Sequence, residues 1–147
     1  MKSVYDAAVR DELITRIRQL TENNQARWGK MTVFQMLKHC TLWEEMVLNG
    51  KKYKRVFVGR LFGRMALNSM VRDDRPLRRN SPSIPELIIT GSGSVALQQE
   101  QWVAQIEEHG KRFNPDFVHP FFGKMTKEET GLLAYKHADH HLQQFGG

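Results

Sequence analysis

Four stretches of this chain repeat apolar residues at the spacing of an amphipathic helix, and this periodicity constrains the fold more than any other feature. Two stretches open with a capping box, in which a threonine and the Gln or Glu three residues later satisfy each other's backbone N–H groups. The two pairs are Thr32 with Gln35 and Thr126 with Glu129. We expect long helices over residues 4–20, 32–48, 95–112 and 126–144.

The segment between the second and third of these helices is less regular. A shorter helix is expected over 58–71, followed by an extended loop that contains Pro76, Pro82 and Pro85. Residues 87–89 are apolar and favour a brief strand, although no partner strand is evident. The sequence therefore predicts an all-α fold, a four-helix bundle in a single domain over 1–147, with a long irregular connection between its second and third helices.

Cysteine content and hydropathy exclude several classes of protein. Cys40 is the only cysteine, so neither an internal disulfide nor a cysteine-rich zinc cage is possible. No run of apolar residues approaches the about 18–20 that a membrane helix needs. Asp6, Arg10 and Asp11 interrupt the N-terminal segment before an apolar stretch typical of a signal peptide develops. We expect no membrane partner and a location in a bacterial cytoplasm.

The net charge is +6, and the excess of basic over acidic residues is concentrated in one block. Residues 51–79 contain ten Lys and Arg against two Asp, which leaves this block at +8 and the rest of the chain at −2. Such a block attracts anions, either a small anionic ligand or nucleic acid, and it is also compatible with a simple solvated linker. Few aromatic residues interleave with it, which disfavours a platform for stacking single-stranded bases.

Three of the six histidines lie close together near the C-terminus. His137 and His141 are four residues apart, so a helix projects both from one face, about one turn apart. At about 100° per residue, both lie at the edge of the apolar stripe, whereas His140 lies further toward solvent. His137 and His141 can therefore chelate one ion from inside the bundle.

His39 occupies the same kind of position on the second expected helix, at the margin of its apolar face. Sites in helix bundles are assembled from inward residues on facing helices. His39, His137 and His141 thus form a candidate three-histidine site, suited to Zn²⁺ or Ni²⁺ and with coordination positions left for water or substrate. The alternative is that these histidines are hydrogen-bonded core residues.

Glu44 falls inside the apolar stripe of the second helix, where a carboxylate needs a partner. It is the candidate catalytic residue, either as a general base or as a group that orients a ligand histidine. A buried ion pair with an arginine of another helix is the plainer alternative. His109 is expected to act as a cation near the end of its helix, and His119 to anchor an aromatic loop.

Several segments resemble the DinB/YfiT-like superfamily of metalloenzymes, and in particular a bacterial branch of unknown function. These segments are residues 28–32, 35–40, 119–126 and 135–145. The resemblance implies a four-helix bundle whose metal ligands are His39, His137 and His141. It also implies either thiol-dependent transfer, in which the metal activates a low-molecular-weight thiol, or metal-dependent hydrolysis. Leu142 and Gln143 stand where better-known branches carry Arg-Gly.

The sequence predicts a metal-dependent enzyme that activates a thiol or water to act on a small, anionic molecule. The alternative is a non-catalytic, stress-associated or nucleic-acid-binding bundle that uses residues 51–79. A homodimer is one open possibility for its assembly.

Overall fold

The computed structural model describes residues 1–147 and is mostly helical. Its only sheet is a two-stranded antiparallel hairpin. The helices and strands follow the order α1 (Ala7–Arg18), α2 (Val33–Asn49), α3 (Phe57–Met70), a 3₁₀ helix (Pro85–Leu87), α4 (Val95–Lys111), β1 (Val118–His119), β2 (Gly123–Lys124) and α5 (Lys127–Gln144).

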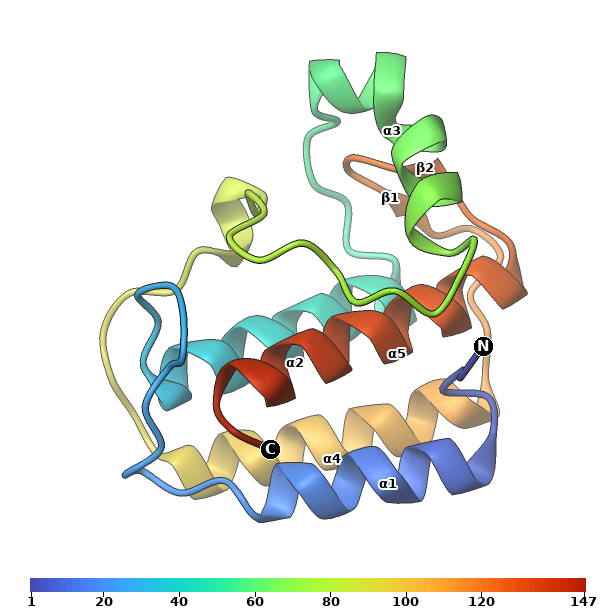
Figure 1. Cartoon of the computed structure of the whole chain (residues 1–147). Coiled ribbons are helices and arrows are strands. Elements are labelled where there is room, and N and C mark those ends of the chain that lie inside the picture. Colours follow the sequence, from blue (N-terminus) through green and yellow to red (C-terminus); the bar gives the residue numbers. More distant parts are fainter.

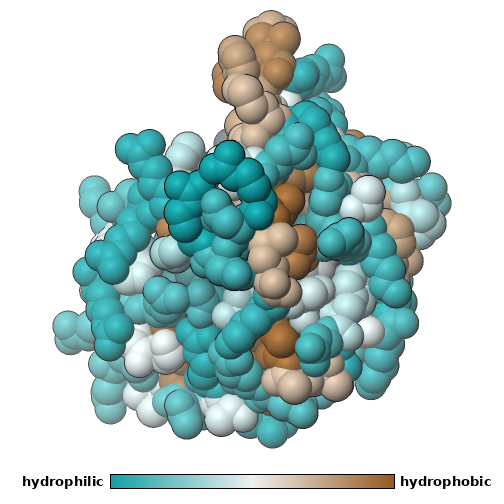
Figure 2. Space-filling model, turned by 45° about the vertical axis from the view of Figure 1, so that its right-hand side comes forward, coloured by the Kyte–Doolittle hydropathy of each residue, from teal (hydrophilic) through white to brown (hydrophobic).

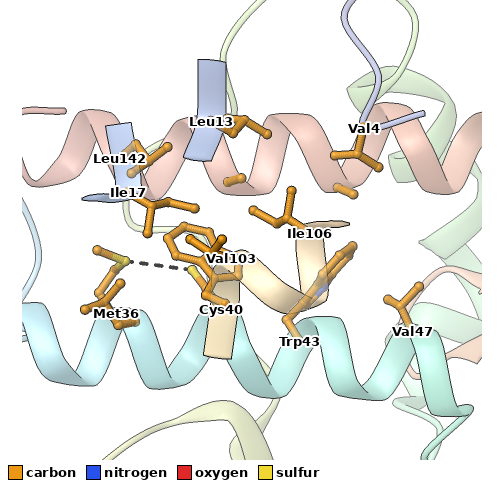
Figure 3. Packing of buried hydrophobic residues seen from close by; sticks show 14 of the residues in the cluster. Val4, Leu13, Ile17, Met36, Cys40, Trp43, Val47, Val103, Ile106 and Leu142 are labelled. Atoms are coloured by element: carbon orange, nitrogen blue, oxygen red, sulfur yellow. Dashed lines mark hydrogen bonds between the residues drawn. The ribbon is translucent and has the colours of Figure 1, made fainter. Parts of the chain in front are cut away.

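Four long helices lie side by side in two layers, with α2 and α5 in one layer and α1 and α4 in the other (Figure 1). The core lies between the layers, and every long helix contributes to it. Figure 3 shows Leu13 of α1, Cys40 of α2, Ile106 of α4 and Leu142 of α5 pointing toward one another. Each helix therefore buries the apolar stripe that its sequence predicts.

The helix termini follow their capping residues. Both predicted capping boxes are present, at the start of α2 and at the start of α5. The first helix is shorter than expected, because the Asp6 side chain accepts from the Ala8 N–H and begins the helix at Ala7. Val4 and Leu20 remain buried although both lie outside α1, which explains why periodicity alone overestimates its length.

The connection from α3 to α4 runs across α2 and α5 and is largely irregular, as expected (Figure 1). The prediction of a strand over 87–89 is wrong, because a 3₁₀ helix over Pro85–Leu87 takes its place and no neighbouring strand exists to pair with. Two contacts fix the path of this connection. The buried Lys136 ammonium donates to the carbonyls of Asp73 and Arg75, and Leu87 packs into the core.

The hairpin of β1 and β2 is a feature that the all-α prediction omits. His119 holds it, since its Nδ1 accepts from the backbone N–H groups of Phe121 and Phe122 at 3.1 and 3.2 Å. This arrangement confirms the expectation that His119 anchors an aromatic loop. Burial, and then the nearby Arg55, lowers the pKa of His119 to about 3, so the ring is neutral and able to accept these bonds.

Helix α3 stands on this hairpin and projects from one end of the molecule (Figure 1). Gly59 and Gly63 face the backbone of Phe121, where a Cβ on Gly59 would lie 2.5 Å from the Phe121 carbonyl oxygen. The two glycines thus allow α3 to lie close to the backbone of Phe121, which any larger side chain at these positions would prevent. None of the helices combines the length and the hydropathy that a membrane span requires.

Candidate metal centre

Three imidazoles from two helices converge between α2 and α5. His39 lies on α2, and His137 and His141 lie one turn apart on α5. One ring nitrogen from each falls within 4.8 Å of the other two, and the Nε2 atoms of His39 and His137 are 3.0 Å apart. The residues that the sequence selected are therefore brought together as a cluster that could hold a metal ion.

The local sequence explains this convergence. The capping boxes fix where α2 and α5 begin, and the apolar stripes fix how each helix rotates toward the core. His39 and His141 sit at the edge of these stripes and are buried, with exposed fractions of 6% and 7%. His137 is partly buried between them, and its ring stacks on Trp43 with centroids 4.8 Å apart.

Hydrogen bonds orient two of the three rings. The Nδ1–H of His39 donates to the Leu87 carbonyl at 2.8 Å, and the Nδ1–H of His141 donates to Oε1 of Gln144 at 2.9 Å. Gln144 is itself oriented, because its Nε2 donates to the Trp28 carbonyl at 2.7 Å. Each bond places the ring proton on Nδ1 and turns Nε2 toward the cluster, where Nε2 of His39 lies at hydrogen-bond distance from Nε2 of His137. Imidazoles that bind metals are typically oriented by such a bond from the other ring nitrogen.

The cluster favours uncharged imidazoles. Burial lowers the pKa of His39, and it lowers the pKa of His137 well below the ordinary value. Burial and then the neighbouring His39 lower the pKa of His141 to about 3. A neutral imidazole is the form that binds a metal, so all three rings are in the ligand state at neutral pH.

His140 lies beside the cluster and is not a member of it, as the helical wheel predicts. Its half-buried ring makes edge contacts with His141 and with Trp28, at centroid distances of 5.2 and 5.5 Å. The guanidinium of Arg79 lies over Trp28, 4.3 Å from the ring centroid. Arg79 therefore brings one positive charge of the 51–79 block near the rim of the histidine cluster.

Glu44 is buried, with an exposed fraction of 2%, and its Oε2 lies 2.6 Å from Nδ1 of His109 on α4. Its partner is thus a histidine rather than the expected arginine, and none of the three clustered imidazoles hydrogen-bonds to it. His109 lies in the last turn of α4, as expected, but its ring is buried against Glu44, with an exposed fraction of 1%, rather than facing solvent at the helix end. A catalytic role for Glu44 stays a prediction.

The pairing of Glu44 with His109 could be predicted from the sequence. Trp102, Ile106 and His109 follow one another at i, i+4 and i+7 and share the buried face of α4. A histidine on such a stripe needs a polar partner, as Glu44 does on α2. Two unpartnered polar groups on facing apolar stripes therefore indicate a pair.

Cys40 behaves as a small hydrophobic residue. Its Sγ lies 3.8 Å from Sδ of Met36 in the core (Figure 3). Burial, and then the charge of Glu44, raises the pKa of the thiol well above its ordinary value. The thiol is protonated at neutral pH and lies outside the histidine cluster.

A family model described as "Protein of unknown function (DUF1569)" matches residues 5–146. No curated protein and no solved structure matches the chain. The matched residues include all three clustered histidines, Glu44 and His109.

Proposed function

The chain belongs to the DUF1569 family, and from the geometry of its histidines we propose that it is a metal-dependent enzyme. In this proposal His39, His137 and His141 bind one divalent transition metal, with Zn²⁺ or Ni²⁺ preferred for neutral nitrogen ligands. The four long helices then form a DinB/YfiT-like bundle over 1–147. The substrate is a small, anionic molecule of the cytoplasm.

One observation carries the proposal. Three neutral imidazoles, two buried and one partly buried, each bring a ring nitrogen within 4.8 Å of the other two, and two of them have their tautomers set from outside by Leu87 and Gln144. Nitrogens that share one tetrahedral ion at about 2.1 Å each lie about 3.4 Å apart. The widest pair here must therefore close by up to about 1.4 Å from within 4.8 Å, and the 3.0 Å pair of His39 and His137 must open slightly, so binding a first-row metal requires small rotations of these side chains.

A metal in such a site lowers the pKa of a water or thiol that completes its coordination, which makes a nucleophile available at neutral pH. The protein's own residues supply orientation and shielding. The Leu87 carbonyl and Gln144 hold two rings in place, and Trp43 covers one face of His137 against water. Arg79 lies at the rim and attracts an anionic substrate or the carboxylate of a thiol cofactor.

Metal analysis of protein purified without a histidine tag tests the proposal. We expect about one equivalent of metal per chain. A metal supplied at 100 times its Kd stabilises the folded chain by about 2.7 kcal/mol, which raises Tm by roughly 8 °C for a domain of this size. The double variant His137→Ala/His141→Ala should lose both the metal and this increase.

His140→Ala is the matched control, because it removes a neighbouring imidazole of α5 that lies outside the cluster. It should keep the metal. Gln144→Ala should weaken metal affinity by about 10- to 100-fold, because His141 would lose the hydrogen bond that orients its ring. If wild-type protein contains no metal, and neither Zn²⁺ nor Ni²⁺ changes its Tm, the enzymatic proposal is wrong.

A nucleic-acid-binding bundle is the second candidate, and the observation that favours it is the exposure of Lys51, Lys52 and Lys54 in a stretch without acidic residues from 46 to 72. A gel shift whose affinity falls steeply with salt, and which is lost when these lysines are replaced by glutamine, would support it. Absence of the shift would leave the metal site as the basis of function.

A further inference from the structure

Helix α3 exposes an apolar face to solvent. Phe57, Leu61 and Met65 are 73%, 63% and 66% exposed, and Val58 and Phe62 beside them are 53% and 52% exposed. In Figure 2 apolar side chains form a projection at the top of the molecule, flanked by hydrophilic ones. No other helix of this chain exposes so many large apolar residues.

The orientation of this face is fixed. Gly59 and Gly63 seat the opposite side of α3 on the backbone of Phe121, and Leu67 of the same side is fully buried. Arg64 forms an ion pair with Glu129 of α5. Since these contacts hold the inner side against the hairpin and α5, the apolar face points outward as part of the folded structure.

The exposed area is comparable to the largest apolar patch of a typical monomer. Five side chains of about 150–200 Å² each, exposed by half or more, present roughly 500 Å². The largest apolar patch of a typical monomer is about 300–600 Å², and patches at the upper end are usually functional. Two such faces, if buried completely, would together bury about 1,000 Å², which is the minimum expected of a specific interface and below the usual range of about 1,200–2,000 Å².

We propose that this face binds the same face of a second copy of the chain. Phe57, Leu61 and Met65 lie at i, i+4 and i+8 and form one ridge, with Leu61 at its centre. A twofold axis through Leu61 makes the ridge self-complementary. Leu61 then packs on Leu61 of the second copy, and Phe57 packs on its Met65, in an antiparallel pair of helices.

The charge distribution is compatible with this antiparallel arrangement. The basic residues Lys51, Lys52 and Lys54 precede the N-terminus of α3. Antiparallel pairing places the two basic segments at opposite ends of a helix of 14 residues, about 20 Å apart. This separation exceeds the Debye length of about 8 Å at physiological ionic strength, so repulsion between the two segments is screened.

This proposal does not depend on the metal site, and its test has different readouts. Sedimentation equilibrium of wild-type protein should give twice the chain mass. Leu61→Gln places an amide at the twofold axis and should weaken dimerisation by at least 100-fold, with unchanged helical circular dichroism and metal content. Leu97→Gln is the matched control, because Leu97 is an exposed leucine of α4, 55% exposed, outside this face. It should remain dimeric.

A cysteine variant tests the register even if Leu61→Gln misfolds. Leu61→Cys should form a disulfide-linked dimer rapidly under mild oxidation, whereas Leu97→Cys should not. The native Cys40 does not interfere, because it is 1% exposed. Equal cross-linking of the two variants, or a monomeric wild-type protein at micromolar concentration, would overturn the proposal. So would binding of a monomeric chain to phosphatidylglycerol vesicles that Leu61→Gln abolishes, since this outcome assigns the face to a lipid surface.

Discussion

Replacement of Glu44 by leucine is expected to destabilise the protein by about 3–5 kcal/mol, because it leaves His109 without its partner in the core. Both side chains are almost inaccessible, at 2% for Glu44 and 1% for His109, and the bond between them is 2.6 Å long. Leucine fills much of the volume of the glutamate, so little of the loss comes from a cavity. What remains is a buried ring nitrogen that has lost its only hydrogen bond.

This loss translates into a measurable change in Tm. Unfolding entropy is about 2.1 cal/mol/K per residue, so a chain of 147 residues loses roughly 3 °C per kcal/mol. Glu44→Leu should therefore lower Tm by about 10–15 °C in thermal unfolding followed by circular dichroism. Glu44→Gln keeps an acceptor for the His109 N–H and should cost less than half as much.

The double variant Glu44→Leu/His109→Leu distinguishes a pair from two independent residues. Since it removes both polar groups, it should be more stable than Glu44→Leu alone. Metal content should not change in any of these variants, because Glu44 does not hydrogen-bond to the clustered histidines. A Glu44→Leu protein within about 1 kcal/mol of wild type would refute the buried-pair reasoning.

Two further predictions concern the hairpin and α3. The pKa of His119 is lowered to about 3 by burial, and it is about 6.5 in an unfolded chain. The unfolded state therefore binds more protons between these values, so stability is complete above about pH 6.5 and falls toward pH 3, by up to about 1.4 kcal/mol per pH unit. Urea unfolding of wild type and His119→Phe at several pH values checks this, and an equal acid slope in both would contradict it. Gly59→Ala should cost about 1–3 kcal/mol and increase proteolysis within α3, because its Cβ would meet the Phe121 carbonyl oxygen at 2.5 Å. Ser69→Ala, on the exposed side of α3, is the control and should match wild type.

The positions of the histidines could be predicted from the sequence because they depend on local rules. Four-residue spacing puts His137 and His141 on one side of any helix, and apolar periodicity places His39 at the margin of its own stripe. Convergence of the two helices then follows from burying these stripes against each other. The cluster is therefore accessible to sequence reasoning, as are the capping boxes of α2 and α5.

Contacts between distant segments could not be predicted in the same way. The bond from His39 to the Leu87 carbonyl joins residues 48 positions apart, and it depends on the path of an irregular connection that no periodicity encodes. The hairpin has two-residue strands, too short for an alternating pattern, and His119 stabilises it through its own neighbours. The outward rotation of α3 depends on Gly59 meeting the backbone of Phe121.

The contacts that hold the connection between α3 and α4 include those of Lys136 with the Arg75 carbonyl and of His39 with the Leu87 carbonyl. Lys136 directly precedes His137 on α5, and His39 belongs to the histidine cluster. Both hydrogen bonds therefore involve a residue of the cluster or its immediate neighbour. Residues 76–86 thus behave as a tether of set length between α5 and α2. Inserting or deleting a residue in 76–86 would turn the ring of His39. This segment would therefore control the distances between the ring nitrogens of His39, His137 and His141 without contacting them.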